Sequence, residues 1–260
     1  MTHQAELFKP LINKKSRFFR LLRSLFDLQF ITIYIDIKKH LSPLTKEQDL
    51  IDIGCGTMPY SDILSEVKSY SGIEHRKHAS LFNDTHNAQC KNLSTSILTV
   101  DSPPWPIETS KYDISLCTEV LEHVYDLKNF LLEIKRITRP QGLLFFTIPF
   151  ATREHFIPND YWRLTRYGIE KLFTESGYRN IKIYPRGNAL TVIFYKISNF
   201  IFLSCLSKKI LATVFGILFL PLGLFFHILS LLSLPFQIGN DCLGYTVFCQ
   251  KPDQIQTDSQ

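Results

Sequence analysis

The middle of the chain alternates between short apolar runs and longer amphipathic stretches. The short runs are bounded by glycine, proline and polar turn residues, which is the pattern of buried strands. Six such runs fall at residues 49–53, 69–74, 97–100, 112–117, 143–148 and 181–184, and residues 243–249 show the same pattern. The sequence therefore predicts seven strands, with the last one separated from the others by a long insertion.

Some connections between these runs have the features of helices. Apolar residues recur at helical spacing between the fourth and fifth runs, at Leu127, Phe130, Leu131, Ile134 and Ile137. This helix is expected to stop at the breaker cluster 139–142, and another to run from an N-cap at Thr165 to Gly177. A helix is also expected after the glycine loop at residues 54–56. Strands alternating with helices predict an α/β fold with a mostly parallel sheet covered on both faces.

An apolar insertion occupies residues 188–240. From residue 210 to residue 240 it contains no Asp, Glu, Lys or Arg. Because the flanking strands belong to one sheet, an insertion that entered a membrane would leave and return on one side. We favour a hairpin that dips into one leaflet and bends near Pro221 and Gly223. Two spans, 190–206 and 210–235, or a buried interface in a homodimer remain alternatives.

Basic and apolar residues are interleaved in the N-terminal region, residues 1–46. Six basic residues lie between Lys9 and Arg23, and Phe18, Leu22, Leu25 and Phe26 fall at helical spacing. Such a basic amphipathic helix can lie on an anionic membrane surface, or it can pack its apolar stripe on the next domain. The apolar insertion favours the membrane, and we expect the protein at the cytoplasmic face of one.

Composition narrows the class of protein without naming it. The 260 residues are 45% hydrophobic and 20% charged, which excludes a mainly disordered chain and suits one large domain or two small ones. A net charge of +5 is too small to imply a nucleic-acid partner. The six cysteines form no C-x-x-C pair and no signal peptide is visible, so we expect a reducing, cytosol-facing environment.

One set of possible metal ligands follows the second predicted strand. These residues are His75, His78, His86 and Cys90. Their spacing matches no common zinc pattern, so we interpret them as loop residues and expect no bound metal.

A glycine loop follows the first predicted strand. Gly54 permits a tight turn, and Gly56 permits a close approach of the backbone to a ligand. Asp52 is the last residue but one of the strand, and Glu74 ends the next strand. A carboxylate at that position can accept both hydroxyls of a ribose. The loop lacks the third glycine of a dinucleotide site and the lysine of a phosphate-binding P-loop, so it favours ribose and a small group.

These motifs resemble class I S-adenosylmethionine-dependent methyltransferases. Residues 52–56 look like their first motif, residues 70–74 like the second-strand motif, and residues 117–124 like the segment after the fourth strand. The stretch 105–113 resembles the family's "LPFPDNSFD", whereas residues 139–142 depart from "KPGG" by one glutamine.

The resemblance implies S-adenosylmethionine as cofactor and assigns its ligands. They are Asp52, Gly54, Cys55, Gly56 and Glu74, together with Asp101 near the adenine amino group and Thr118 and Glu119 after the fourth strand.

The resemblance also implies a fold and a domain plan. The fold is a Rossmann-like, doubly wound seven-stranded sheet whose last strand runs antiparallel beside the sixth, with an apolar helical insertion between them. The methyltransferase domain is then formed by residues 47–187 and 241–252, the membrane-associating insertion by residues 188–240, and residues 253–260 are a disordered tail.

Residues 155–165 resemble an H-x-x-P-x-D-Y-x-R-x-T segment of a subgroup placed with cell-surface polysaccharide and glycolipid synthesis. His155 is the candidate general base, because imidazole titrates near neutral pH. Asp160 would orient it or act as the base, and Tyr161 and Arg163 would hold the acceptor. The alternative is that these residues form a structural hydrogen-bond cluster, and we interpret His123 as structural.

The expected activity is methyl transfer at a membrane surface. The expected acceptor is a small-molecule, glycan or lipid-linked one, bearing an oxygen on a sugar or lipid-linked glycan intermediate. Methylation of a lipid or quinone head group and a non-catalytic, cofactor-binding membrane scaffold are the alternatives, and a nicotinamide oxidoreductase is disfavoured by the missing third glycine.

Overall fold

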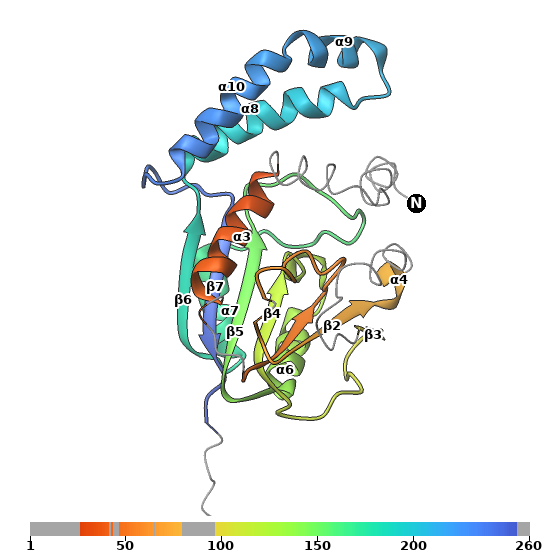
Figure 1. Ribbon diagram of the computed structural model, residues 1–260, viewed down its shortest axis with the longest axis vertical. Coiled ribbons are helices and arrows are strands. Elements are labelled where there is room, and N and C mark those ends of the chain that lie inside the picture. Colours follow the sequence, from red (N-terminus) through yellow and green to blue (C-terminus); the bar gives the residue numbers. More distant parts are fainter. Residues whose placement is uncertain (1–26, 42, 44–46, 65, 80–96, 254–260) are drawn as a thin grey trace, which may run out of the picture. The chain divides into compact units, whose positions relative to one another are not determined.

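The computed structural model describes residues 27–41, 43, 47–64, 66–79 and 97–253 (Figure 1). The strands are β1 (Asp49–Ile53), β2 (Ser69–His75), β3 (Ile97–Val100), β4 (Tyr112–Thr118), β5 (Thr138–Pro149), β6 (Arg179–Arg186) and β7 (Gly244–Gln250). The helices are α3 (Leu28–His40), α4 (Arg76–Ala79), the 3-10 turn η1 (Leu121–His123), α6 (Leu127–Ile137), α7 (Arg166–Glu175), α8 (Ala189–Cys205), α9 (Ile210–Leu218) and α10 (Leu220–Ser233).

The chain divides into two compact units, each described by itself. The first unit comprises residues 1–33, 149–156 and 185–245, and it contains the apolar insertion. The second unit comprises residues 34–148, 157–184 and 246–260, and it contains most of the sheet.

The strands form one seven-stranded sheet in the order β3-β2-β1-β4-β5-β7-β6. The neighbouring pairs β3-β2, β2-β1, β1-β4 and β4-β5 are parallel. β7 is antiparallel to β5, because Lys251 donates to the carbonyl of Gly142 near the start of β5 and Phe150 donates to that of Leu243 after its end. The predicted fold and the antiparallel last strand beside β6 are confirmed.

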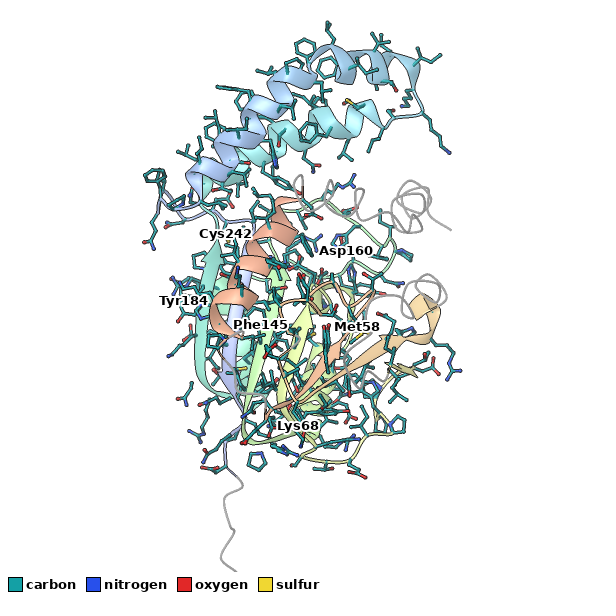
Figure 2. The ribbon with its side chains drawn as sticks, viewed as in Figure 1. Met58, Lys68, Phe145, Asp160, Tyr184 and Cys242 are labelled. Atoms are coloured by element: carbon teal, nitrogen blue, oxygen red, sulfur yellow. The ribbon has the colours of Figure 1, made fainter. Side chains whose placement is uncertain are left out.

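The hydrophobic core lies on both faces of β5. Phe145 and Phe146 are consecutive and fully buried, so their side chains point to opposite faces. Phe146 packs edge-on against Phe173 of α7, with 4.9 Å between ring centroids. Phe145 packs against Phe248 of β7, also at 4.9 Å, and Figure 2 labels it within the sheet. Helix and sheet therefore cover each other, as the alternating pattern predicted.

Helix α3 is the part of the N-terminal region that the structure describes. Ile33 and Ile37 are buried, Asp36 accepts a 2.6 Å hydrogen bond from Thr246 of β7, and the His40 ring lies 4.6 Å from that of Phe248. This helix therefore packs on the sheet. The basic stretch from Lys9 to Arg23 lies outside the described residues, and its membrane role stays a prediction.

Two local predictions were wrong. Among the described residues between Gly54 and Lys68, the chain forms successive turns and no helix. Pro59 lacks a backbone donor and Met58 has a positive φ of 52°, and both features oppose a regular helix. The cluster 139–142 ends α6 as predicted, but it already belongs to β5, with Gln141 at a φ of 59° and a register shift opposite Tyr112–Ile114.

The apolar insertion folds into a helical hairpin. Asn188 caps α8 by accepting from the backbone of Thr191, and Ala189 donates to the carbonyl of Ile238, so the two ends of the hairpin meet. Helices α8 and α10 run side by side, and α9 and α10 meet at a 62° bend (Figure 1). No single helix in the described part of the chain is long and apolar enough to cross a membrane. The bent pair α9–α10, taken together, has the length and the composition of a membrane span, and only these two properties support one.

The packing of Phe146 yields a test of the core. Phe146→Ala removes a fully buried ring between Phe173 and Tyr178, so the free energy of unfolding should fall by about 3–5 kcal/mol in urea titrations. Leu132→Ala on α6, where the side chain is 38% exposed, is the matched control and should cost less than about 1 kcal/mol. Equal losses in both variants would contradict this account of the core.

Candidate active site

The glycine loop follows β1 and is shaped by two positive φ angles. Gly54 has a φ of 71° and Gly56 a φ of 51°. A Cβ on Gly54 would lie 2.4 Å from the side chain of Val120, so only glycine fits beneath that residue. A Cβ on Gly56 would meet nothing within 4 Å, which leaves the backbone there open to a ligand. The geometry allows the turn at Gly54 and a close ligand at Gly56, and the contact of both glycines with a cofactor stays a prediction.

Glu74 fixes the loop from the end of β2. Its Oε2 accepts a 2.8 Å hydrogen bond from the backbone of Gly56, and its Oε1 accepts one of 2.9 Å from His75. The residue is only 5% exposed, and burial raises the pKa of its carboxyl group, while the two backbone donors lower it. The carboxylate predicted to hold a ribose is therefore aimed at the loop.

Asp52 lies in the core at the end of β1. It is 1% exposed and its Oδ2 accepts a 2.6 Å hydrogen bond from the hydroxyl of Tyr70. Burial raises the pKa of Asp52 to about 7; the Tyr70 hydrogen bond opposes this shift, and the nearby charge of Glu74 adds to it. The structure thus gives Asp52 the role of a buried support behind the loop.

Cys55 is buried below the loop, where it depends on a glycine in the neighbouring strand. A Cβ on Gly72 of β2 would lie 2.6 Å from the Sγ of Cys55. The thiol therefore occupies the space that Gly72 leaves free. The contact was not predicted, although the spacing of Tyr70, Gly72 and Glu74 by two residues puts all three on one face of β2 and could have indicated it.

The end of β4 lies beside the end of β1 in the sheet. Ile53 pairs with Cys117, and Thr118, which follows Cys117, pairs with Thr147 of β5. Glu119 has a positive φ of 52°, and its backbone donates to both the carbonyl and the hydroxyl oxygen of Thr147 at 3.1 Å. Thr118 and Glu119 thus share the carboxyl edge of the sheet with the glycine loop, which is where ligands bind in such folds.

Asp101 follows β3 and is exposed. Its carboxylate pairs with Arg76 at 3.1 Å, and the aspartate side chain is 63% exposed. β3 is the neighbour of β2, so Asp101, which follows β3, and Glu74, near the end of β2, lie at the ends of adjacent strands. Its role at the adenine stays a prediction.

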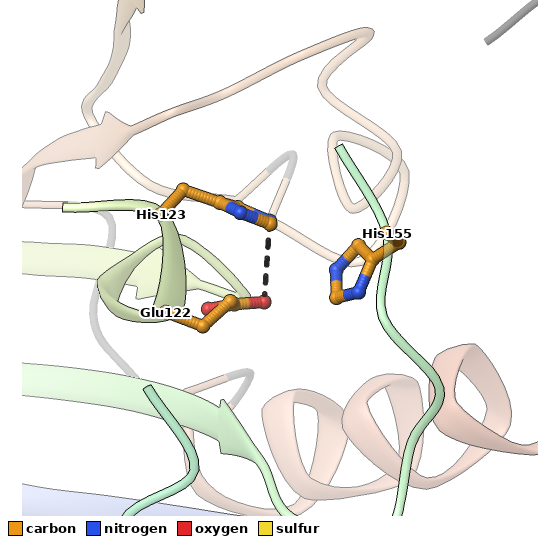
Figure 3. Close-up of side chains that lie close together, drawn as sticks. All are labelled: Glu122, His123 and His155. Carbon is orange, nitrogen blue, oxygen red and sulfur yellow. Dashed lines mark ion pairs between the residues drawn. The ribbon is translucent and has the colours of Figure 1, made fainter. Parts of the chain in front are cut away.

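The segment 159–163 is tied to the turn after β4. Tyr161 donates to the carbonyl of Glu122 at 2.7 Å, and His123 Nδ1 lies 2.6 Å from the carbonyl oxygen of Asn159. Figure 3 shows Glu122 and His123 side by side, with 3.5 Å between Oε1 and Nε2. His123 therefore has the structural contacts that its interpretation requires.

Arg163 and Asp160 form a two-pronged ion pair. The two guanidinium nitrogens lie 2.6 and 2.7 Å from the two carboxylate oxygens. The Asp160 carboxylate raises the pKa of Arg163, and the charges of Glu122 and Glu119 add to this. Arg163 is thus held near the acids that follow β4, and Asp160 orients Arg163.

His155 belongs to the first unit. Its Nδ1 lies 3.2 Å from the carbonyl oxygen of Arg153, and its ring packs against Phe156 with 5.8 Å between centroids. Its catalytic role, like that of Tyr161 and Arg163, stays a prediction. Of the possible metal ligands, His86 and Cys90 lie outside the described residues, as does the side chain of His78.

The sheet order, the glycine loop and the acid at the end of β2 together define a class I S-adenosylmethionine-dependent methyltransferase domain. The sequence profile of a family described as a methyltransferase domain matches residues 26–182, and the chain belongs to that family. The match includes α3, which lies outside the predicted methyltransferase domain of residues 47–187 and 241–252.

Curated relatives share part of this chain. A ubiquinone biosynthesis O-methyltransferase of Rickettsia typhi is 22% identical over 144 residues, which cover 54% of this chain and 56% of the relative. A ubiquinone biosynthesis O-methyltransferase of Bartonella tribocorum is 31% identical over 97 residues, which cover 37% of this chain and 39% of the relative. The chain thus matches about half of the first relative's length and less of the second's.

Solved structures share the fold at low identity. A possible histamine N-methyltransferase of Thermotoga maritima has a TM-score of 0.54 at 15% identity, covering 95% of this chain and 99% of that one. Phosphoethanolamine N-methyltransferase 2 of Haemonchus contortus, solved with S-adenosyl-L-methionine, has a TM-score of 0.56 at 15% identity, covering 85% and 52%. Similarity at this level supports the fold alone.

The Glu74 carboxylate provides a test of the cofactor site. In Glu74→Gln the amide group replaces one of the two acceptor oxygens, so affinity for S-adenosylmethionine should fall about ten- to a hundredfold in calorimetry. Glu170→Gln on the exposed face of α7 is the control and should bind like the parent protein. Unchanged affinity in Glu74→Gln would remove this residue from the cofactor site.

The buried Asp52 predicts a pH dependence of stability. Its folded-state pKa of about 7 lies above the ordinary value of 3.8, so the folded protein binds more protons between these values than the unfolded chain. The free energy of unfolding should therefore fall as pH rises from about 4 to 7, by on the order of 2–4 kcal/mol.

Asp52→Asn keeps an acceptor for Tyr70 and has no titrating carboxyl group. Urea titrations at pH 5 and pH 8 should therefore show a smaller loss of stability in the variant than in the parent. A parallel pH profile in the two proteins would contradict a raised pKa at Asp52.

Proposed function

We propose that the protein transfers a methyl group from S-adenosylmethionine to an oxygen of a sugar or lipid-linked glycan at the cytoplasmic face of a membrane. One observation carries the proposal: the segment bearing Tyr161 and Arg163 is hydrogen-bonded to the turn after β4, at the carboxyl edge where the glycine loop lies. Candidate acceptor groups are therefore held at the same edge as the cofactor loop.

The residues at this edge fit the cofactor. The open space beside Gly56 admits a close ligand, and the buried Glu74 carboxylate matches a pair of ribose hydroxyls. When bound, S-adenosylmethionine supplies an electrophilic methyl group on a sulfonium. Glu74 and the loop would hold it, Val120 closes the loop from above Gly54, and Asp52 and Tyr70 support the loop from the core.

Methyl transfer to the acceptor depends mainly on how the acceptor is positioned. In a displacement reaction, alignment of the reacting atoms supplies much of the rate gain. Arg163, held by Asp160, offers donors to a phosphate or carboxylate on the acceptor. Tyr161 is 42% exposed and its hydroxyl donates to Asn159, so it can also orient a polar acceptor. His155 is the candidate base that accepts the proton of the acceptor hydroxyl.

Aromatic side chains beside this segment support a sugar acceptor. Tyr125 and Tyr161 pack edge-on at 5.6 Å, and Tyr125 is 79% exposed. The indole of Trp162 donates to the carbonyl of Val124, and Trp162 lines an open surface depression of about 470 Å³. Exposed rings with polar edges suit a ligand that is partly apolar and partly wet, as a sugar face is.

A quinone head group is the second candidate acceptor. The observation that favours it is the similarity to the ubiquinone biosynthesis O-methyltransferases described above. The same exposed aromatic side chains and a nearby membrane would also suit an aromatic acceptor. A non-catalytic, cofactor-binding membrane scaffold is the remaining alternative, because this fold and its cofactor loop do not by themselves require methyl transfer.

The decisive experiment measures transfer of a labelled methyl group from S-adenosylmethionine to two acceptor pools. One pool is a lipid-linked glycan extract and the other a hydroxylated quinone precursor, each in vesicles. Label in the glycan pool supports the first candidate and label in the quinone pool the second. Cofactor binding without transfer to either pool would favour the non-catalytic alternative, and no binding would overturn the proposal.

Arg163→Lys separates acceptor binding from chemistry. Lysine keeps the charge but loses the two-pronged geometry with Asp160, so KM for a charged acceptor should rise about tenfold or more with a smaller change in kcat. Arg166→Lys at the start of α7 is the control and should leave both constants unchanged. A loss confined to kcat in Arg163→Lys would contradict an acceptor-binding role.

A further inference from the structure

The helical hairpin has a polar and small-residue interior. Among the buried positions of α10 are Gly223, His227, Ser230 and Ser233, and none of them is a large apolar residue. The facing helix α8 buries Thr191 and Ser198 along with two aliphatic residues. This is the reverse of the usual arrangement in water, in which the large apolar side chains face inward.

Close contacts and hydrogen bonds make this interior a specific interface. A Cβ on Gly216 would lie 2.4 Å from the backbone nitrogen of Cys205, and one on Gly223 would lie 2.9 Å from Ile201. The hydroxyls of Thr191 and Ser233 lie 2.7 Å apart, and Ser233 in turn donates to the carbonyl of Ser230. Small residues and interhelical hydroxyl bonds are what hold helices together inside lipid.

The sides of α9 and α10 that do not face α8 are apolar and largely exposed. On α10 alone, residues 220–222, 224 and 225 are exposed, and neighbouring residues on a helix point to different sides. The exposed large side chains of these helices are Ile210, Leu211, Val214, Phe215, Ile217, Leu218, Leu220, Leu222, Leu224, Phe225, Ile228 and Leu232. Figure 2 shows the side chains of α9 and α10 projecting outward from the pair.

To shield these exposed apolar side chains from water, a partner must contact several sides of the hairpin. A second copy of the chain would bury one exposed side of the hairpin and leave its other exposed sides in water. A fluid of acyl chains covers every direction equally. The inverted arrangement of polar and apolar residues therefore favours lipid over a protein partner.

We infer that residues 189–238 form a membrane hairpin that lies within one leaflet, with α9 and α10 among the acyl chains and α8 toward the head groups. This deepens the proposed function, because it rests on the proposed membrane location and describes how the membrane is bound. The charges support the orientation: the lysines of the hairpin, Lys196, Lys208 and Lys209, lie on α8 and the following turn, whereas α9 and α10 carry no charge. Lysines at head-group depth bind anionic lipids.

Helix lengths and the bend argue against two crossings. The 17 residues of α8 span about 26 Å and the 14 residues of α10 about 21 Å, both short of the roughly 30 Å hydrocarbon core. The 62° bend turns α9 away from the direction of α10. Since Ala189 is hydrogen-bonded to Ile238, the chain enters and leaves the leaflet at one point.

The test measures the depth of single probes in vesicles. An environment-sensitive fluorophore is attached to one cysteine at Leu211, Leu222, Phe225, Lys196 or Lys209, with Cys90 and Cys205 replaced by serine, in full-length protein. The vesicles contain 70% phosphatidylcholine and 30% phosphatidylglycerol. Probes at Leu211, Leu222 and Phe225 should brighten severalfold and be quenched by acyl-chain quenchers, whereas those at Lys196 and Lys209 should be quenched at head-group depth.

The position of the Lys209 probe decides between one leaflet and two spans. A reductant added outside the vesicles should bleach it if the hairpin stays in the outer leaflet, and protection of that probe would overturn the inference. The inference would also be overturned if, without vesicles, the protein sedimented as a dimer and aqueous quenchers could not reach the probes on α9 and α10. That result would favour a second copy of the chain as the cover.

A charge variant gives a second readout. Lys208→Gln with Lys209→Gln should weaken binding to the anionic vesicles about fivefold for each lysine and reduce its salt dependence. Lys171→Gln on α7, whose side chain is 75% exposed, is the control and should bind normally. Equal binding by all these proteins would contradict the role of the turn lysines.

These measurements do not depend on methyl transfer. Vesicle binding at the expected depths with no transfer to either acceptor pool would leave the hairpin standing and overturn the proposed function. Transfer by a protein that does not bind vesicles would overturn the hairpin inference and the membrane location, and would leave the methyl transfer itself standing.

Discussion

The candidate site depends on one buried carboxylate, that of Glu74. Its two oxygens accept from the backbone of Gly56 and His75, so one side chain joins the glycine loop to the end of β2. The loop needs this support because residues 54–64 form only successive turns, and no helix begins there to fix the backbone. The same oxygens are the natural partners of ribose hydroxyls. The group that organises the loop is thus also the group that would recognise the ligand.

Much of this fold was predictable from the sequence, because the strands of a buried parallel sheet are short apolar runs between turn residues. β1 and β3 have the predicted bounds, and α6 begins and ends at Leu127 and Ile137 as its apolar spacing indicated. The residues that follow the glycine loop escaped prediction. Their local pattern does not reveal that Met58 takes a positive φ, a feature that only the surrounding structure stabilises.

In the candidate site, charged residues were easier to predict than the residues that support them. Glu74 stands out because an acid at the end of a buried strand needs a function or a partner. Gly72 and Val120 do not stand out in the sequence. Gly72 matters because its missing side chain leaves space for Cys55, and Val120 matters because it leaves no space for a side chain at residue 54. Contacts of this kind depend on the register between β1, β2 and β4, which a single sequence does not state.

The position of the hairpin between β6 and β7 has a consequence for the order in which the protein is built. β7 lies between β5 and β6, and most of its residues are buried, so the sheet is not closed until β7 has entered it. During synthesis the residues of the hairpin leave the ribosome before those of β7. If lipid covers the hairpin, the chain meets the bilayer while its sheet is still open between β5 and β6. Maturation of the enzyme domain would then be coupled to arrival at the membrane, and a chain that failed to arrive would expose both an unpaired sheet edge and the apolar helices.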